Sequence, residues 1–199
     1  MYDWRTMTEE ERSRVTALRR ARRFPKHSPP HWDLKGDLHY LISAACYEHV
    51  TVIGKSPERM TDCEAEVLQV CREFGSETHA WCILPNHYHV LVRTERIEEL
   101  RRELGQFHGR SSFNWNKEDE QRGRKVWHNC FERPMKSERH FWATLNYVHH
   151  NPVHHGYVEH WRDWPWSSAA EFLQRIGREK AAEIWKKYPV LDYGKKWDV

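Results

Sequence analysis

Two histidines, at positions 87 and 89, stand at the start of an alternating run that ends near Arg93. Successive side chains of a β-strand point to opposite faces, so a strand here places His87 and His89 on one face together with Arg93. Imidazoles about 7 Å apart along one strand can converge on a divalent cation if a third group approaches from outside the sheet. The pair is therefore half of a metal site, although it is equally consistent with two polar strand residues in a chain that has 15 histidines.

A tyrosine and an asparagine four residues apart form the second candidate group. Tyr147 and Asn151 share one side of a predicted helix, away from its apolar residues. A tyrosine in the last turn of a helix that faces two histidines can act as a covalent nucleophile beside a metal ion. A phenol with a pKa near ~10 needs a cation or a base to lose its proton at neutral pH, and His149 and His150 are candidates for that base. The alternative is a tyrosine that only packs or donates a hydrogen bond.

The residues around the histidines predict a β-hairpin that follows a helix. Ser56 and Pro57 are typical of a helix start and Gly75 of a helix end, and apolar residues recur between them at spacings of three and four. Residues 79–84 predict a strand, which a tight turn joins to a second strand over residues 87–94. The hairpin therefore presents the histidines.

The remaining elements complete an α+β pattern. We expect a first strand over residues 38–47, a helix from residue 97 that ends before Gly123, a strand over residues 125–131, and a helix from Ser137 that stops at Pro152. The order β-α-β-β-α-β predicts a ferredoxin-like four-stranded antiparallel sheet with two helices on one face. The last helix, which carries Tyr147, can then cover the other face.

Both ends of the chain are predicted to lie outside this sheet. Residues 8–23 begin with acidic and end with basic side chains, an order that complements a helix dipole, and residues 24–31 contain three prolines. A further helix is expected from Ala169 to about Tyr188. We therefore divide the chain into an N-terminal helix with a Pro-rich linker (1–32), a central catalytic domain (33–172) and a C-terminal helical tail (173–199).

The composition excludes several classes of protein. The balance of 32 Lys+Arg against 29 Asp+Glu gives a net charge of +3, which is too small to diagnose nucleic-acid binding. The five cysteines are odd in number and form no C-x-x-C, so neither a disulfide framework nor a paired-thiolate zinc site is indicated. The sequence has no apolar run of ~20 residues and no basic-then-apolar leader. These features predict a cytoplasmic protein with no membrane partner.

Three motifs occur in a fixed order along the chain. They are Pro-Asn-His-Tyr-His-Val-Leu-Val at residues 85–92, Tyr-Val-His-His-Asn-Pro-Val at residues 147–153, and Asp-Trp-Pro-Trp-Ser-Ser at residues 163–168. Together they resemble the REP-associated tyrosine transposases, which are single-tyrosine members of the HUH endonucleases. The resemblance covers residues 33–172, and three motifs in one order are far more specific than any one of them. Related insertion-sequence transposases carry glutamine where this chain has Asn151.

The resemblance implies a metal-dependent endonuclease and strand transferase, a transposase acting on single-stranded DNA beside hairpins of repetitive palindromes. On that analogy, His87 and His89 bind Mg²⁺ or Mn²⁺. Tyr147 attacks the scissile phosphorus, which gives a 5′-phosphotyrosine and a free 3′-OH. Asn151 supplies the remaining protein ligand or positions the metal. The covalent link conserves the energy of the broken bond, so no nucleotide cofactor is expected.

DNA binding would depend on basic and aromatic side chains. Phosphate contacts are expected from Arg93, Arg96, Arg101, Arg102, Arg110, Arg122, Arg124 and Lys125, and base stacking from exposed rings such as Trp115 or Trp127. The alternative for the basic residues is a solvated charged face. A monomer and a homodimer are both consistent with the sequence.

Two other functions remain open at this stage. The first is a zinc hydrolase that uses the strand histidines with further ligands from His128, His149 or Cys130. Tightly held zinc would favour it, whereas weakly held Mg²⁺ or Mn²⁺ would favour the transposase. The second is a non-catalytic single-strand-binding module derived from a transposase.

Overall fold

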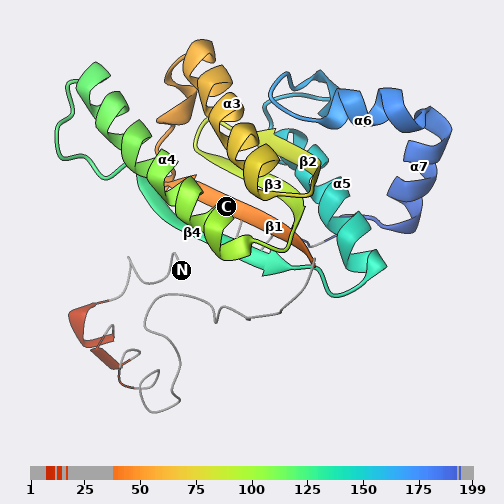
Figure 1. Ribbon diagram of the computed structural model, residues 1–199, viewed down its shortest axis with the longest axis horizontal. Coiled ribbons are helices and arrows are strands. Elements are labelled where there is room, and N and C mark those ends of the chain that lie inside the picture. The colour runs from red at the N-terminus through yellow and green to blue at the C-terminus, as the bar shows by residue number, and fades with distance from the viewer. Residues whose placement is uncertain (1–7, 12, 15–16, 18–37, 192, 194–199) are drawn as a thin grey trace. The chain divides into compact units, whose positions relative to one another are not determined.

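The structure, a computed structural model, describes residues 8–11, 13–14, 17, 38–191 and 193 (Figure 1). The chain divides into two compact units, one of Lys35–Tyr193 and one of Met1–Leu34 with Gly194–Val199, and each is described by itself. In the second unit, residues 9–11, 13, 14 and 17 are helical. The Thr8 hydroxyl accepts a hydrogen bond from the Glu11 amide, and the Glu11 carboxylate accepts one from the Thr8 amide. The rest of the predicted 8–23 helix, and the predicted linker, lie outside the described residues.

The larger unit is built on four antiparallel strands, β1 (Leu38–Cys46), β2 (Glu77–Ile83), β3 (His87–Thr94) and β4 (Trp127–Pro134). Their order in the sheet is β2-β3-β1-β4. Each pair of neighbours is antiparallel, which is the order expected of the ferredoxin-like split arrangement. The predicted α+β fold class is confirmed.

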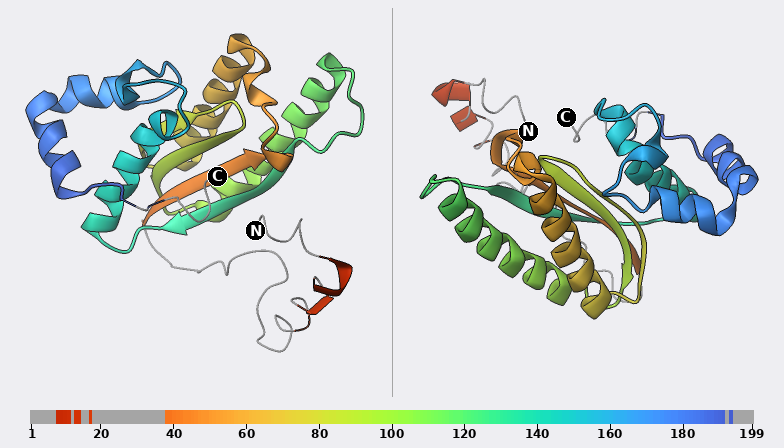
Figure 2. Two further views of the ribbon diagram at one scale, coloured as in Figure 1. Left: turned by 180° about the vertical axis from the view of Figure 1, so that it is seen from behind. Right: turned by 90° about the horizontal axis from the view of Figure 1, so that it is seen from above.

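Helices cover both faces of the sheet (Figure 2). Helices α3 (Pro57–Phe74) and α4 (Ile97–Glu118) lie on one face, and α5 (Glu138–His154), α6 (Ala169–Ile176) and α7 (Arg178–Lys187) lie on the other side. Short 3₁₀ turns occupy Tyr47–His49, Ile53–Lys55 and Trp161–Asp163. Among the described helices, none is long and apolar enough to cross a membrane.

The alternation predicted for β3 separates the core from the histidines. Tyr88, Val90 and Val92 are buried in a core that also contains Leu100 and Leu104 of α4. His87 and His89 point to the opposite face, where α5 packs against β2 and β3. The sheet therefore keeps its apolar core and its histidine pair on different sides.

The cysteines are free thiols, as their number and spacing predicted. Four are buried, and Cys130 is partly buried. Burial raises the pKa of Cys46 to about 11 and that of Cys71 to about 12, so these thiols stay protonated at neutral pH.

The turn before the histidines is held by close backbone packing. The Gly54 amide donates to the Pro85 carbonyl at 2.8 Å, and a Cβ on Gly54 would lie 2.3 Å from Pro85 Cβ. The Cys46 amide donates to the Asn86 carbonyl at 2.7 Å. Only glycine permits this approach, which fixes the turn and therefore the start of β3.

Several predicted boundaries were wrong. Helix α5 does not stop at Pro152 but continues to His154, because a proline so close to a helix end removes one hydrogen bond without requiring the chain to turn away. The single predicted helix over residues 169–188 is two helices, since Gly177 takes φ 82° and its amide closes α6 on the Leu173 carbonyl. Strand β4 spans Trp127–Pro134 rather than residues 125–131.

A neutral histidine is buried under the core side of the sheet. His108 of α4 is 8% exposed, its Nε2 lies 2.9 Å from the Tyr88 hydroxyl, and its ring stacks on Trp127 with 4.2 Å between centroids. Burial lowers the pKa of His108 to about 4. An unfolded histidine takes up a proton near pH ~6.5, so the unfolded chain binds more protons than the folded chain between these two values.

We therefore expect the free energy of unfolding to fall as the pH decreases from about 6.5 to 4, by roughly 3 kcal/mol for His108. His108→Gln should flatten this part of the stability profile, measured by urea unfolding at successive pH values. Replacing the exposed His160 by glutamine is the matched control and should leave the slope unchanged. An equal slope in His108→Gln and the wild type would contradict the assignment.

Candidate active site

Strand β3 and helix α5 bring the four predicted site residues together. The Tyr147 hydroxyl lies 3.1 Å from His89 Nε2, and Asn151 Oδ1 lies 3.0 Å from His87 Nε2. The two imidazoles are 5.0 Å apart between centroids. The spacing of four on α5 therefore matches the spacing of two on β3, so that each helix residue meets one histidine. Asn151 reaches the site although it is shorter than glutamine.

The neighbouring Asn86 fixes the proton on His87. Asn86 Nδ2 donates to the His49 carbonyl at 3.2 Å, which orients the amide so that its oxygen lies 2.8 Å from His87 Nδ1. A carbonyl oxygen can only accept, so Nδ1 of His87 carries a hydrogen and donates it. In a neutral ring, Nε2 then has a lone pair.

The other nitrogen of His87 faces helix α5. His87 Nε2 lies 3.0 Å from Asn151 Oδ1, within hydrogen-bonding distance. His87 Nε2, Asn151 Oδ1 and His89 Nε2 are therefore three possible donor atoms directed at one centre. Imidazole nitrogen and amide oxygen are ligands that Mg²⁺, Mn²⁺ and related ions accept, so the donor set fits a divalent cation.

His89 is held from its other side by a serine on β1. Ser43 Oγ lies 2.7 Å from His89 Nδ1. When the hydroxyl accepts from Nδ1–H, Nε2 keeps a lone pair toward Tyr147, which is the form required of a metal ligand. Ser43 and Asn86 thus hold the two imidazoles in the same way, through their Nδ1 atoms.

The centre of the site is buried in the described arrangement. His87, His89 and Tyr147 are each 3% exposed or less, and Asn151 is fully buried. Tyr193 packs on Tyr147 with 5.0 Å between ring centroids. A phosphate can reach the tyrosine only after this cover moves.

Neither predicted base lies at the nucleophile. His149 contacts Ser168 instead, with 2.9 Å between its Nε2 and Ser168 Oγ, and its ring stacks on Trp161. Burial lowers the pKa of His149 to about 3, so it stays neutral. His150 packs on Trp185, and burial also lowers its pKa. Both side chains leave α5 on sides other than that of Tyr147, and the nitrogen that meets the phenol belongs to His89.

Sequence reasoning missed the residues that support the histidines. Asn86 was treated only as part of a turn, although it directly precedes His87. Ser43 gave no signal, because nothing in a strand sequence shows which residue pairs across the sheet. His155, just past α5, also lies beside His87, with 4.9 Å between ring centroids.

The structure does not assemble the zinc site that was an alternative. Among the described residues, no group of three or more His, Cys, Asp or Glu side chains is placed to hold a metal. His128 stacks on Tyr47 and Phe131, and Cys130 packs against the core on the opposite face.

Many of the basic residues predicted to bind phosphates form ion pairs. The pairs are Arg96–Glu99, Arg101–Glu132 at 3.0 Å, Arg102–Glu103 at 3.2 Å, Arg110–Glu66 at 3.0 Å and Arg124–Asp119 at 2.7 Å. Those on α4 lie across the sheet from the histidines, whereas Arg93 shares their face of β3. Arg122 and Lys125 are exposed in the loop before β4. Contacts of these residues with DNA stay a prediction.

Arg124 is held by a buried carboxylate. Arg59, Lys55 and Arg124 all donate to Asp119, whose side chain is 2% exposed. The Arg59 guanidinium beside Asp119 holds the pKa of that carboxyl well below its usual range. Arg124 therefore ties the loop before β4 to the end of α4.

The predicted stacking tryptophans belong to the core. Trp115 and Trp127 are 6% and 7% exposed and contact each other, with 5.6 Å between ring centroids. Trp127 begins β4 on the face that α4 covers, so its ring cannot stack on a base. The prediction that these two rings are exposed for stacking was wrong.

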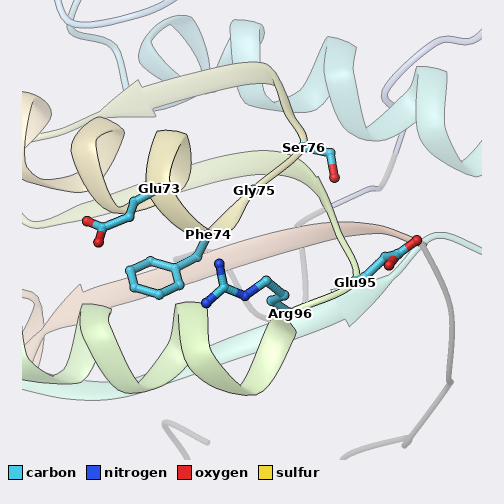
Figure 3. A pocket seen from close by; sticks show the side chains of 6 residues that line it. All are labelled: Glu73, Phe74, Gly75, Ser76, Glu95 and Arg96. Atoms are coloured by element: carbon cyan, nitrogen blue, oxygen red, sulfur yellow. The ribbon is translucent and has the colours of Figure 1, made fainter.

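A small surface pocket lies at the other end of β3 (Figure 3). Its lining is Glu73, Phe74, Gly75, Ser76, Glu95 and Arg96. Arg96 stacks on Phe74 at 4.9 Å and pairs with Glu99. The length of the strand, roughly 23 Å, separates this pocket from the histidines, so it is not part of the site.

A known protein family matches the part of the chain that carries these site residues. Residues 37–151 match the family described as Transposase IS200 like. The match ends at Asn151 and includes both histidines and Tyr147.

Named relatives and a solved structure agree with the family match. A Haemophilus influenzae protein that carries the name REP-associated tyrosine transposase is 32% identical over 133 residues, which are 62% of this chain and 74% of that protein. The Escherichia coli K12 REP-associated tyrosine transposase is 26% identical over 111 residues, 51% of this chain and 59% of its own length. A REP-associated tyrosine transposase solved with a REP hairpin has a similar fold, with a TM-score of 0.54 and 17% identity over 74% of this chain and 86% of its own.

The support that Ser43 gives to His89 can be tested by substitution. Ser43→Ala leaves the buried Nδ1 without this hydroxyl, which should cost about 1 kcal/mol of stability in urea unfolding. Ser43→Thr keeps a hydroxyl and should retain most of the stability. If the alanine variant were as stable as the wild type, the hydrogen bond would not contribute.

Proposed function

Because the chain belongs to the REP-associated tyrosine transposases, within the IS200-like family, we propose that it cleaves and rejoins single-stranded DNA through Tyr147 in a metal-dependent reaction. The observation that carries this proposal is the meeting of the Tyr147 hydroxyl, the two β3 imidazoles and Asn151 Oδ1 in one buried centre. A nucleophile and a cation-compatible donor set are the parts that this reaction requires.

The proposed cation is Mg²⁺ or Mn²⁺, held by His87 Nε2, His89 Nε2 and Asn151 Oδ1. When bound, it would neutralise the charge that develops on the non-bridging phosphate oxygens. The side chains around it have a separate task. Asn86 and Ser43 contact the two rings through their Nδ1 atoms, so that both Nε2 atoms face the centre.

Tyr147 is the proposed nucleophile. Its oxygen would form a bond to the scissile phosphorus while the bond from phosphorus to the 3′ oxygen breaks. The phenol gives up its proton and the leaving oxygen takes one, which yields a 5′-phosphotyrosine and a free 3′-OH. In the described arrangement the Tyr147 hydroxyl contacts His89 Nε2. If that nitrogen held a cation, it would no longer bind the hydroxyl, and the tyrosine oxygen could turn toward a phosphate.

The proposed substrate is single-stranded DNA beside a hairpin. The solved relative with a REP hairpin supports this class of DNA. Arg93, which is exposed on the histidine face of β3, would contact a backbone phosphate near the site. The cover over Tyr147, including Tyr193, would have to move for the strand to enter.

The tyrosine mechanism predicts a covalent product. Purified protein with Mn²⁺ and labelled hairpin oligonucleotides from repeats beside its gene should give a shifted band on a denaturing gel, and the position of the label should show a 5′ link. Tyr147→Phe should bind the same DNA and form no band, because only the nucleophilic oxygen is removed. Cleavage by Tyr147→Phe at the wild-type rate would disprove the role of Tyr147, and DNA binding without any cleavage by wild type would favour a binding module.

The metal site predicts a selective change in metal dependence. His87→Ala removes one of three proposed ligands and should raise the Mn²⁺ concentration for half-maximal cleavage by roughly tenfold or more. Mn²⁺ binding measured by calorimetry should weaken in parallel, without reference to activity. The exposed His160→Ala is the matched control. An unchanged Mn²⁺ titration in His87→Ala would disprove the assignment.

A further inference from the structure

Three rings form a row on the half of the sheet that carries β4. Tyr47 and His128 lie nearly parallel, with 6.4 Å between centroids and 11° between planes. His128 and Phe131 continue the row at 6.3 Å and 23°. All three side chains are partly exposed. We call Tyr47, His128 and Phe131 the aromatic row.

The aromatic row lies on the histidine face of the sheet. Trp127 and Cys130 point into the core on the other face, so their neighbours in β4 point away from it. A register shift opposite Ala44 and Cys46 adds one residue to β4, which leaves Asn129 exposed and brings His128 and Phe131 to the same side.

Strand register connects the aromatic row to the site. Phe131 pairs with Ser43, and Ser43 pairs with His89 on its other side. The Ser43 hydroxyl also lies 2.7 Å from His89 Nδ1. Phe131 is therefore two strand spacings from His89, about 10 Å, on the same face.

Positive charge flanks the aromatic row. Lys125 Nζ lies 4.4 Å from the centre of the Tyr47 ring and is exposed at one end. Arg133, two residues beyond Phe131 on the same face of β4, is exposed at the other end. Parallel rings between two cations match the alternation of bases and phosphates in a single strand.

From this arrangement we infer that the aromatic row is a stacking subsite for the unpaired bases next to the scissile phosphate. The inference rests on the proposed function, since it names the part of the substrate that would lie beside Tyr147. Stacking does not depend on which base is present, so the subsite would hold the strand without reading its sequence. Lys125 and Arg133 would contact the phosphates on either side.

The test measures DNA binding separately from cleavage. In a Tyr147→Phe background, fluorescence anisotropy would compare three probes: a hairpin from the repeats beside the gene, the same hairpin with a single-stranded thymidine tail, and the hairpin with an abasic tail. Phe131→Ala and Tyr47→Ala should each weaken binding of the thymidine-tailed probe by roughly tenfold. Binding of the bare hairpin and of the abasic tail should not change.

Matched variants separate stacking from folding. Phe131→Leu keeps an apolar side chain without a ring and should lose as much affinity as the alanine variant, whereas Phe131→Tyr should retain it. Phe113→Ala removes a phenylalanine that is 72% exposed on α4, across the sheet, and should have no effect. Wild-type affinity of Phe131→Leu and Tyr47→Ala for the thymidine tail would overturn the subsite while leaving the proposed function intact. Failure of the Tyr147→Phe protein to bind any of the three probes would overturn both.

Discussion

An imidazole ring can be held through one nitrogen while its other nitrogen is directed at a ligand, and the buried centre of the protein depends on this property. His87 Nδ1 lies 2.8 Å from Asn86 Oδ1, and His87 Nε2 lies 3.0 Å from Asn151 Oδ1. Helix α5, strand β3 and the turn held by Gly54 are all needed to bring these atoms together. The same atoms would hold the proposed cation, which is why we regard the asparagine and the histidines as one unit.

Much of the fold could be predicted because its signals are local. The Ser56 cap, the Pro57 start and the alternation from His87 each depend on residues close in sequence, and the structure has all three. The end of α5 and the break at Gly177 were not predicted, since a helix can pass a proline in its last turn and a glycine can either cap or continue. In those places the surrounding packing decides, and the sequence does not reveal it.

The candidate site was also predicted in part, and the correct part again depends on residues that are close in sequence. Spacing along β3 and α5 was enough to expect that Tyr147 and Asn151 face the histidines, as they do. It could not show that Ser43 stands behind His89, because strand register is a long-range property. It also misplaced His149 and Trp127, whose surroundings are determined by the elements that cover α5 and by the core under β4. Residue type indicates what a side chain can do, whereas its partners depend on tertiary packing.

Helix α5 is buried on both sides, and this sets a lower limit on the length of a fragment that could keep the helix packed. The family match ends at Asn151, yet Asn146 donates to the Tyr188 carbonyl at 2.8 Å, His149 lies against Ser168, and His150 packs on Trp185. A fragment cut at the end of the shared region would expose these polar and aromatic groups to water on the helix that carries the nucleophile. The smallest fragment that keeps α5 packed on both sides therefore extends through α7, well past the residues that the family match covers.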